Sequence, residues 1–182
     1  MRYMCFDNSR KLVSSLLLFL PAGICVLIIW LIFQVNSPEK TLESFTYTGI
    51  YGARVFEPEV GKMKMIVLFS TRCSFCMSYL SQLNKNTERL PDFQYGLFTT
   101  DRNLFQSVYY KNWNSLNIDD RFLLGMLDMN TSFRIFSDPP LPSTFLYDEN
   151  NNLIKSLRGE MQIREIMDWI PDVNRKNYKK GV

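Results

Sequence analysis

The sequence contains no histidine. This absence excludes Ser–His and Cys–His catalysis, most zinc enzyme sites and any pH switch that depends on imidazole. Chemistry must therefore come from cysteine, carboxylate, lysine, tyrosine or hydroxyl groups. Strong charge is lacking as well, because a formal net charge of +3 over 182 residues is too small to indicate a nucleic-acid partner. We expect none.

Cysteine is scarce: the chain has four, and Cys5 and Cys25 lie before and inside an apolar segment. Only Cys73 and Cys76 lie beyond it, so there they can pair only with each other. No second Cys or His pair follows, which disfavours a zinc site. A purely structural disulfide would close a very short loop and add little stability. We expect no metal site and no cofactor.

Charge is absent from residues 12–33, whereas residues 1–11 carry Arg2, Arg10 and Lys11. As a helix the apolar run spans about 33 Å, enough for the roughly 30 Å core of a bilayer. A cleaved signal peptide would have a shorter apolar core, and a lipoprotein would need a small residue before its cysteine. The sequence therefore predicts an uncleaved single-pass anchor in the cytoplasmic membrane.

The basic flank predicts that residues 1–11 lie in the cytoplasm and that the chain after the anchor lies outside it, in the periplasm or an equivalent extracytoplasmic space. The polar residues 34–44 are interpreted as a tether. The length of the remainder favours one domain, predicted at 45–173, followed by a basic tail at 174–182.

Hydrophobic patterns predict the elements of this domain. Aromatic and β-branched residues with two glycines at 45–56 indicate a hairpin. Helical spacing within 104–113 and 122–127 predicts two helices whose aromatic residues are buried. The other predicted strands are 65–69, 93–99, 143–147 and 153–157, and the other predicted helices begin near residues 74 and 161.

The dithiol lies where a strand leads into a helix. Cys73 is at the helix N-terminus, where unpaired N–H groups and the helix dipole stabilise a thiolate. Cys76 is one turn further on, in the same apolar stripe as Leu80 and Leu83, and is expected to be more buried. It can attack a mixed disulfide on Cys73 and release the substrate. Cys73 is therefore the predicted nucleophile and Cys76 the predicted resolving cysteine.

A second motif, Leu-Pro-Ser-Thr-Phe at 141–145, begins a strand with a proline. The dithiol, this motif and the strand–helix order together resemble the thioredoxin superfamily over roughly residues 45–170. The anchor and the longer spacing between the motifs look like the extracytoplasmic, TlpA-type branch. The resemblance implies an α/β thioredoxin-like fold with a central mixed sheet flanked by helices, in which residues 101–135 are an insertion.

The resemblance also implies a site. Cys73 and Cys76 would form a redox-active disulfide, Pro142 would be a cis-proline packed against it, and the backbone of Leu141 would pair with an extended substrate. The expected substrate surface comprises Arg72, Ser74, Phe75, Leu141 and Pro142. The expected activity is thiol–disulfide oxidoreduction, with disulfides of exported proteins being reduced. The expected partners are these proteins and a membrane or extracytoplasmic thiol donor.

Two positions depart from the family pattern. Arg72 stands where a tryptophan usually precedes the first cysteine, and Val67 stands where cytosolic thioredoxins keep a buried acid. The direction of electron flow is therefore left open. Two alternatives also remain: a binding module with a passive disulfide, and a thiol peroxidase that uses Arg72, Thr71 and Arg134 around its cysteine.

Overall fold

The computed structural model describes residues 41–113, 116, 119–159 and 162–168. The predicted anchor at 12–33, its flank at 1–11 and the tail at 174–182 lie outside these residues. Within the described part of the chain, no helix is long and apolar enough to cross a membrane.

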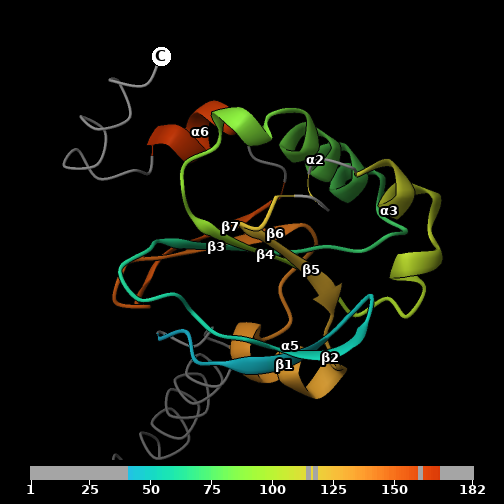
Figure 1. Cartoon of the computed structure of the whole chain (residues 1–182), viewed down its shortest axis with the longest axis horizontal. Helices are drawn as coiled ribbons and strands as arrows, with labels where there is room; N and C mark the ends of the chain where they lie inside the picture. Colours follow the sequence, from blue (N-terminus) through green and yellow to red (C-terminus); the bar gives the residue numbers. More distant parts are fainter. Residues whose placement is uncertain (1–40, 114–115, 117–118, 160–161, 169–182) are drawn as a thin grey trace, which may run out of the picture. The chain divides into compact units, whose positions relative to one another are not determined.

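A mixed sheet forms the centre of the described domain (Figure 1). The described residues contribute seven strands to it, in the order β2-β1-β5-β4-β3-β6-β7. Strands β3, β4 and β5 are parallel, and the other neighbouring pairs are antiparallel. The strands are β1 Phe45–Gly49, β2 Gly52–Phe56, β3 Lys64–Leu68, β4 Gln94–Thr99, β5 Phe122–Met126, β6 Ser143–Tyr147 and β7 Leu153–Arg158.

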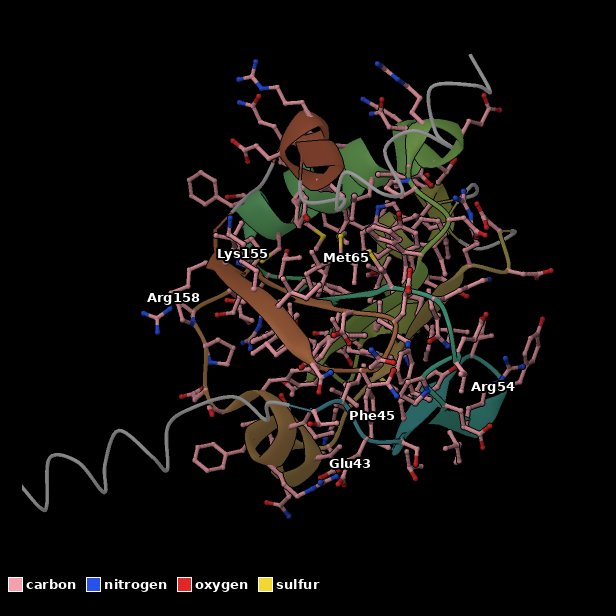
Figure 2. The ribbon with its side chains drawn as sticks, turned by 90° about the vertical axis from the view of Figure 1, so that its left-hand side faces the viewer. Glu43, Phe45, Arg54, Met65, Lys155 and Arg158 are labelled. Carbon is pink, nitrogen blue, oxygen red and sulfur yellow. The ribbon has the colours of Figure 1, made fainter. Side chains whose placement is uncertain are left out.

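Helices cover both faces of this sheet. Helices α2, α3 and α6 lie on one face and α5 lies on the other (Figures 1 and 2). Their bounds are α2 Ser74–Lys85, α3 Val108–Asn112, α5 Met129–Phe136 and α6 Ile163–Asp168, and the short 3-10 turns are η1 Thr87–Arg89 and η2 Leu104–Gln106.

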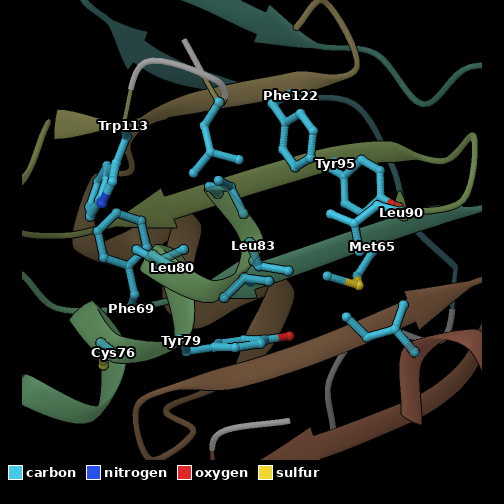
Figure 3. Packing of buried hydrophobic residues seen from close by; sticks show 14 of the residues in the cluster. Met65, Phe69, Cys76, Tyr79, Leu80, Leu83, Leu90, Tyr95, Trp113 and Phe122 are labelled. Carbon is cyan, nitrogen blue, oxygen red and sulfur yellow. The ribbon is translucent and has the colours of Figure 1, made fainter. Parts of the chain in front are cut away.

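Strand β3 separates two hydrophobic cores, because successive side chains of a strand point to opposite faces. Met65 and Val67 belong to the core on the α2 side. Ile66 and Leu68 belong to the core on the α5 side. All five residues of β3 are buried, as expected for a central strand with both faces covered. Figure 3 shows the α2-side core, which includes Cys76.

Several predicted elements are confirmed. The segment 45–56 forms the hairpin of β1 and β2, and the strands predicted at 65–69, 93–99, 143–147 and 153–157 are present within one residue of their ends. The bridge between Thr41 and Asn152 and the buried side chain of Leu42 show that the packed domain also includes residues 41–44, which the sequence assigned to the tether.

The helix predicted within 122–127 is wrong, because Phe122–Met126 form β5. Strand β5 is paired on both edges, with β1 and β4, and it packs against both cores, through Leu124 on the α2 side and Leu123 on the α5 side. It therefore shows no simple alternation of polar and apolar residues. The segment 101–135, interpreted as an insertion, thus contributes β5 to the central sheet. The burial predicted for the helical pattern at 104–113 is wrong at Val108 and Tyr109, which are exposed, while Leu104 and Trp113 are buried.

Candidate active site

Cys73 caps the N-terminus of α2. Its backbone is extended, with φ −96° and ψ 114°, and its Sγ accepts a hydrogen bond from the backbone N–H of Cys76 at 3.3 Å. This is the position in which a helix leaves backbone N–H groups without partners inside the helix, and the sulfur of Cys73 accepts a hydrogen bond from one of them. The Cys73 side chain is partly exposed, so a substrate sulfur can reach it.

Cys76 lies one turn further along α2 and is fully buried in the α2-side core (Figure 3). Burial, and then the neighbouring Cys73, raise the pKa of the Cys76 thiol to about 12. The two sulfurs are therefore unequal: one is reachable and caps a helix, and the other is enclosed and holds its proton at neutral pH. Both are free thiols in this structure.

The environment of Cys76 provides little charge. Val67 is fully buried in the same core, where the family pattern has an acid. Thr144 is paired opposite Val67 across β3 and β6, and its hydroxyl lies 3.2 Å from the Tyr79 hydroxyl. An uncharged surrounding disfavours the thiolate form, which agrees with the raised pKa of Cys76.

The motif at 141–145 lies beside the dithiol, because β6 pairs with β3 and begins with Ser143 opposite Leu68. The Leu141–Pro142 peptide bond is cis, as the resemblance implies. The carbonyl oxygen of Leu141 is 4.0 Å from Cys73 Sγ, within reach of a weak S–H···O contact. Leu141 and Cys73, which are nearly seventy positions apart in the sequence, thus lie side by side at the surface.

Three predicted surface residues surround Cys73 in the sequence. Arg72, Ser74 and Phe75 are all exposed, and Phe75 is one of several large apolar side chains at the surface. The Arg72 guanidinium, 88% exposed, is 3.5 Å from Asp101 Oδ1. So exposed an ion pair contributes little to stability.

Asp101 holds the loop that carries Cys73, and sequence reasoning missed it. Its Oδ2 accepts hydrogen bonds from Ser70 Oγ at 2.8 Å, from the Thr71 backbone N–H at 2.6 Å and from Thr71 Oγ1 at 2.9 Å. A signal was present: Asp101 follows β4, and the ends of adjacent parallel strands meet at one edge of a sheet. The carboxylate therefore fixes the turn between β3 and Cys73.

The charge on Asp101 is stabilised by these contacts. Burial works to raise its pKa, but the hydrogen bonds from Ser70 and Thr71, assisted by Arg72, outweigh burial and hold the pKa of Asp101 below its ordinary value. The side chain is only 13% exposed. Hydrogen bonds to a carboxylate in such a position are stronger than those between neutral groups.

The groups named for a peroxidase site are engaged elsewhere. Thr71 and Arg72 both contact Asp101. Arg134 lies on α5, on the other face of the sheet from α2, and its Nη1 is 4.0 Å from Glu43 Oε2. Arg134 therefore lies on the opposite face of the sheet from the helix that carries the two cysteines.

No protein-family model matches the chain, and no curated protein matches it. Solved structures do. StoA from Bacillus subtilis matches with a TM-score of 0.56 at 15% identity, covering 73% of this chain and 100% of that chain. A thiol:disulfide interchange protein from Bacteroides sp. matches with a TM-score of 0.57 at 15% identity, covering 75% and 91%.

A third similar structure is a secreted Mycobacterium tuberculosis disulfide oxidoreductase, which matches with a TM-score of 0.54 at 18% identity, covering 67% of this chain and 90% of that chain. At such identities the likeness concerns the fold. The described domain, with its mixed sheet and its Cys73–Cys76 pair at the start of α2, has a thioredoxin-like fold.

Proposed function

We propose that this protein is a thiol–disulfide oxidoreductase whose redox pair is Cys73 and Cys76. The observation that carries the proposal is the inequality of the two sulfurs beside Leu141. Cys73 is partly exposed and caps α2, whereas Cys76 is buried and its pKa is raised to about 12. A reachable nucleophile and an enclosed second thiol are what disulfide exchange in two steps requires.

In the reducing direction, Cys73 Sγ attacks one sulfur of a client disulfide. A bond forms between Cys73 and the client as the client S–S bond breaks, and the other client sulfur leaves as a thiolate and takes a proton. Cys76 then attacks Cys73 Sγ, and the second client sulfur leaves with the proton that Cys76 gives up. Two electrons pass to the client, and a Cys73–Cys76 disulfide remains.

The neighbouring residues have separate roles in this proposal. Asp101 keeps the turn before Cys73 in place through Ser70 and Thr71. Leu141 and Pro142 form the wall beside Cys73 along which an extended client segment lies, and Arg72, Ser74 and Phe75 form the exposed surface around it. A thiol donor must return two electrons for another turnover.

We further propose that the domain works outside the cytoplasm, tethered by the apolar segment 12–33, on disulfides of exported proteins. The support is the uncharged run with its basic flank, and a structurally similar protein that is described as a secreted disulfide oxidoreductase. Disulfides persist in such compartments.

The test is to trap clients with a Cys76→Ala variant. Alanine suits the site because it adds no polar group to an apolar core, whereas serine would bury a hydroxyl. Without Cys76 the mixed disulfide on Cys73 cannot be resolved. Client proteins should therefore accumulate in disulfide-linked complexes that a reductant dissociates. The matched control is the double variant Cys73→Ala/Cys76→Ala, which should trap nothing. Absence of trapped proteins from the single variant would refute exchange.

A binding module with a passive disulfide is the second candidate, favoured by the uncharged Val67 and by Arg72 in place of tryptophan. Such a module binds its partner whether or not the cysteines are present. Partner capture that is equal in the single variant, in the double variant and in the presence of reductant would therefore select this candidate over the oxidoreductase.

A further inference from the structure

A pocket of about 190 Å³ lies at the ends of β3 and β4, and Leu141, one of the residues that line it, contacts Cys73. Its floor includes Leu68, Phe98 and Leu127, which belong to the α5-side core. Its walls are the side chains of Met129 and Phe133 on α5 and the chain before the cis bond, which ends at Leu141. The pocket is therefore apolar in its depth.

Two residues that line this pocket, both on α5, are large, apolar and exposed. Met129 is 70% exposed and Phe133 is 53% exposed. Large apolar side chains that gather around a hollow are typical of a surface that binds a ligand or another protein.

Leu141 joins this pocket to the reacting sulfur. Its residue lines the pocket, while its carbonyl oxygen lies 4.0 Å from Cys73 Sγ. An extended chain advances about 3.3 Å per residue. A client segment whose cysteine reaches Cys73 therefore has a neighbouring residue, one or two positions away, at the mouth of the pocket.

We propose that this Leu141 pocket receives one bulky apolar side chain of the client, from a residue close to the client cysteine. The proposal rests on the oxidoreductase function proposed above and assigns it a substrate class: extended segments with an aromatic or branched aliphatic residue beside the cysteine. The size is suitable, since a cavity of about 150 Å³ lined by such side chains accommodates benzene.

The rim of the pocket restricts this choice of side chain. Four residues with hydroxyl side chains, Thr99, Thr100, Ser132 and Ser137, also line the pocket, together with the exposed Asp138, which carries a negative charge. A client carboxylate would meet this charge and would lose water on entering the apolar floor. Aspartate beside the client cysteine should thus be the poorest residue, alanine intermediate, and phenylalanine or leucine the best.

The experiment uses disulfide-linked dimers of a short peptide with a single cysteine, so that both sulfurs carry the same flanking residues. The residues one and two positions from the cysteine are varied in turn among Phe, Leu, Ala and Asp. The full-length protein in detergent reduces each dimer, dithiothreitol regenerates the enzyme, and kcat/KM is measured from the release of peptide thiol above the uncatalysed rate. We expect about a tenfold preference for Phe over Ala at one position.

Substitutions of residues that line the pocket test whether the preference for Phe over Ala arises there. Phe133→Ala removes a wall and should reduce the Phe-to-Ala ratio severalfold. Ser132→Leu fills the pocket and should bring the ratio of kcat/KM for the Phe peptide to that for the Ala peptide down to one or below one. Both positions lie on α5 and neither is deeply buried, so the fold should be kept. The matched control is Val108→Ala, an exposed apolar truncation on α3 that is outside the pocket lining and should keep the ratio.

The outcomes separate the two proposals. Equal kcat/KM for all peptide dimers, with reduction still catalysed, would overturn the pocket and leave the oxidoreductase function standing. A Phe preference that survives both Phe133→Ala and Ser132→Leu would also overturn the pocket. Failure to reduce any dimer would overturn the oxidoreductase function, and the pocket proposal would fall with it.

Discussion

Asp101 Oδ2 accepts a 2.6 Å hydrogen bond from the backbone N–H of Thr71, two residues before Cys73. The same oxygen also accepts hydrogen bonds from the hydroxyls of Ser70 and Thr71. One carboxylate at the end of β4 thus orders the turn at the end of β3. The turn that leads to Cys73 is therefore held by a residue that is distant in sequence.

Removing this charge should destabilise the fold and slow the exchange. Asp101→Asn keeps the shape but replaces the carboxylate with an amide, which weakens three hydrogen bonds. We expect a loss of about 1–3 kcal/mol in the free energy of unfolding, measured by urea denaturation followed by circular dichroism. Asp92→Asn is the control: that carboxylate is exposed, and the change should stay within about 0.5 kcal/mol. Equal losses in the two variants would contradict the role of Asp101.

The contribution of Asp101 should depend on pH. Its pKa in the folded state is below the ordinary value of about 3.9, so between the two values the unfolded chain binds more protons than the folded chain. Stability from this group is therefore present above about pH 4 and is lost as the pH falls through the folded-state pKa.

This pH dependence can be measured by urea denaturation of the wild type and of Asp101→Asn at several pH values. The difference in unfolding free energy should be full at pH 7 and should shrink toward zero below the folded-state pKa. Asp119, Asp128 and Asp148 also have lowered pKa values, but both proteins keep them, so their effects cancel in the difference. A difference that stays constant from pH 7 to strongly acidic conditions would show that the charge is not the cause.

The two cysteines should differ in reactivity. In the reduced, folded protein at pH 7.5, iodoacetamide should modify Cys73 rapidly and leave Cys76 largely unmodified. The reason is that Cys76 is buried and its pKa is raised to about 12, so almost none of it is thiolate. Peptide mapping by mass spectrometry identifies each site. The same labelling in denaturant should modify both, and equal rates in the folded protein would contradict the asymmetry.

Gly125 in β5 should tolerate no side chain. A Cβ at this position would overlap the Tyr47 ring and lie 2.8 Å from the backbone carbonyl oxygen of Thr48. We expect Gly125→Ala to cost more than about 2 kcal/mol of unfolding free energy, because the obstructing strand β1 cannot move away freely. In the control Gly49→Ala, the new Cβ meets the flexible Arg54 side chain at 3.3 Å, so the cost should be below about 1 kcal/mol. Equal costs would contradict the close approach of β1 and β5.

The sequence predicted a secondary-structure element correctly where the residues of that segment alone carried a recognisable hydrophobic pattern. The hairpin at 45–56, the strand before the dithiol and the strand after Pro142 all combine apolar runs with turn residues. The prediction failed at 122–127, since apolar residues at helical spacing also suit a strand that is covered on both faces. Only the neighbouring strands, β1 and β4, decide between these two structures.

The sequence alone was enough to place the dithiol. With Cys73 and Cys76 three positions apart after an apolar run, the pair was predicted at the start of a helix, because that relation is local in the chain. The surroundings of the dithiol depend on contacts between distant segments. Asp101 meets the turn before Cys73, and Leu141 meets Cys73 itself, only because β4 and β6 both pair with β3, and pairing between distant segments cannot be read from any one of them.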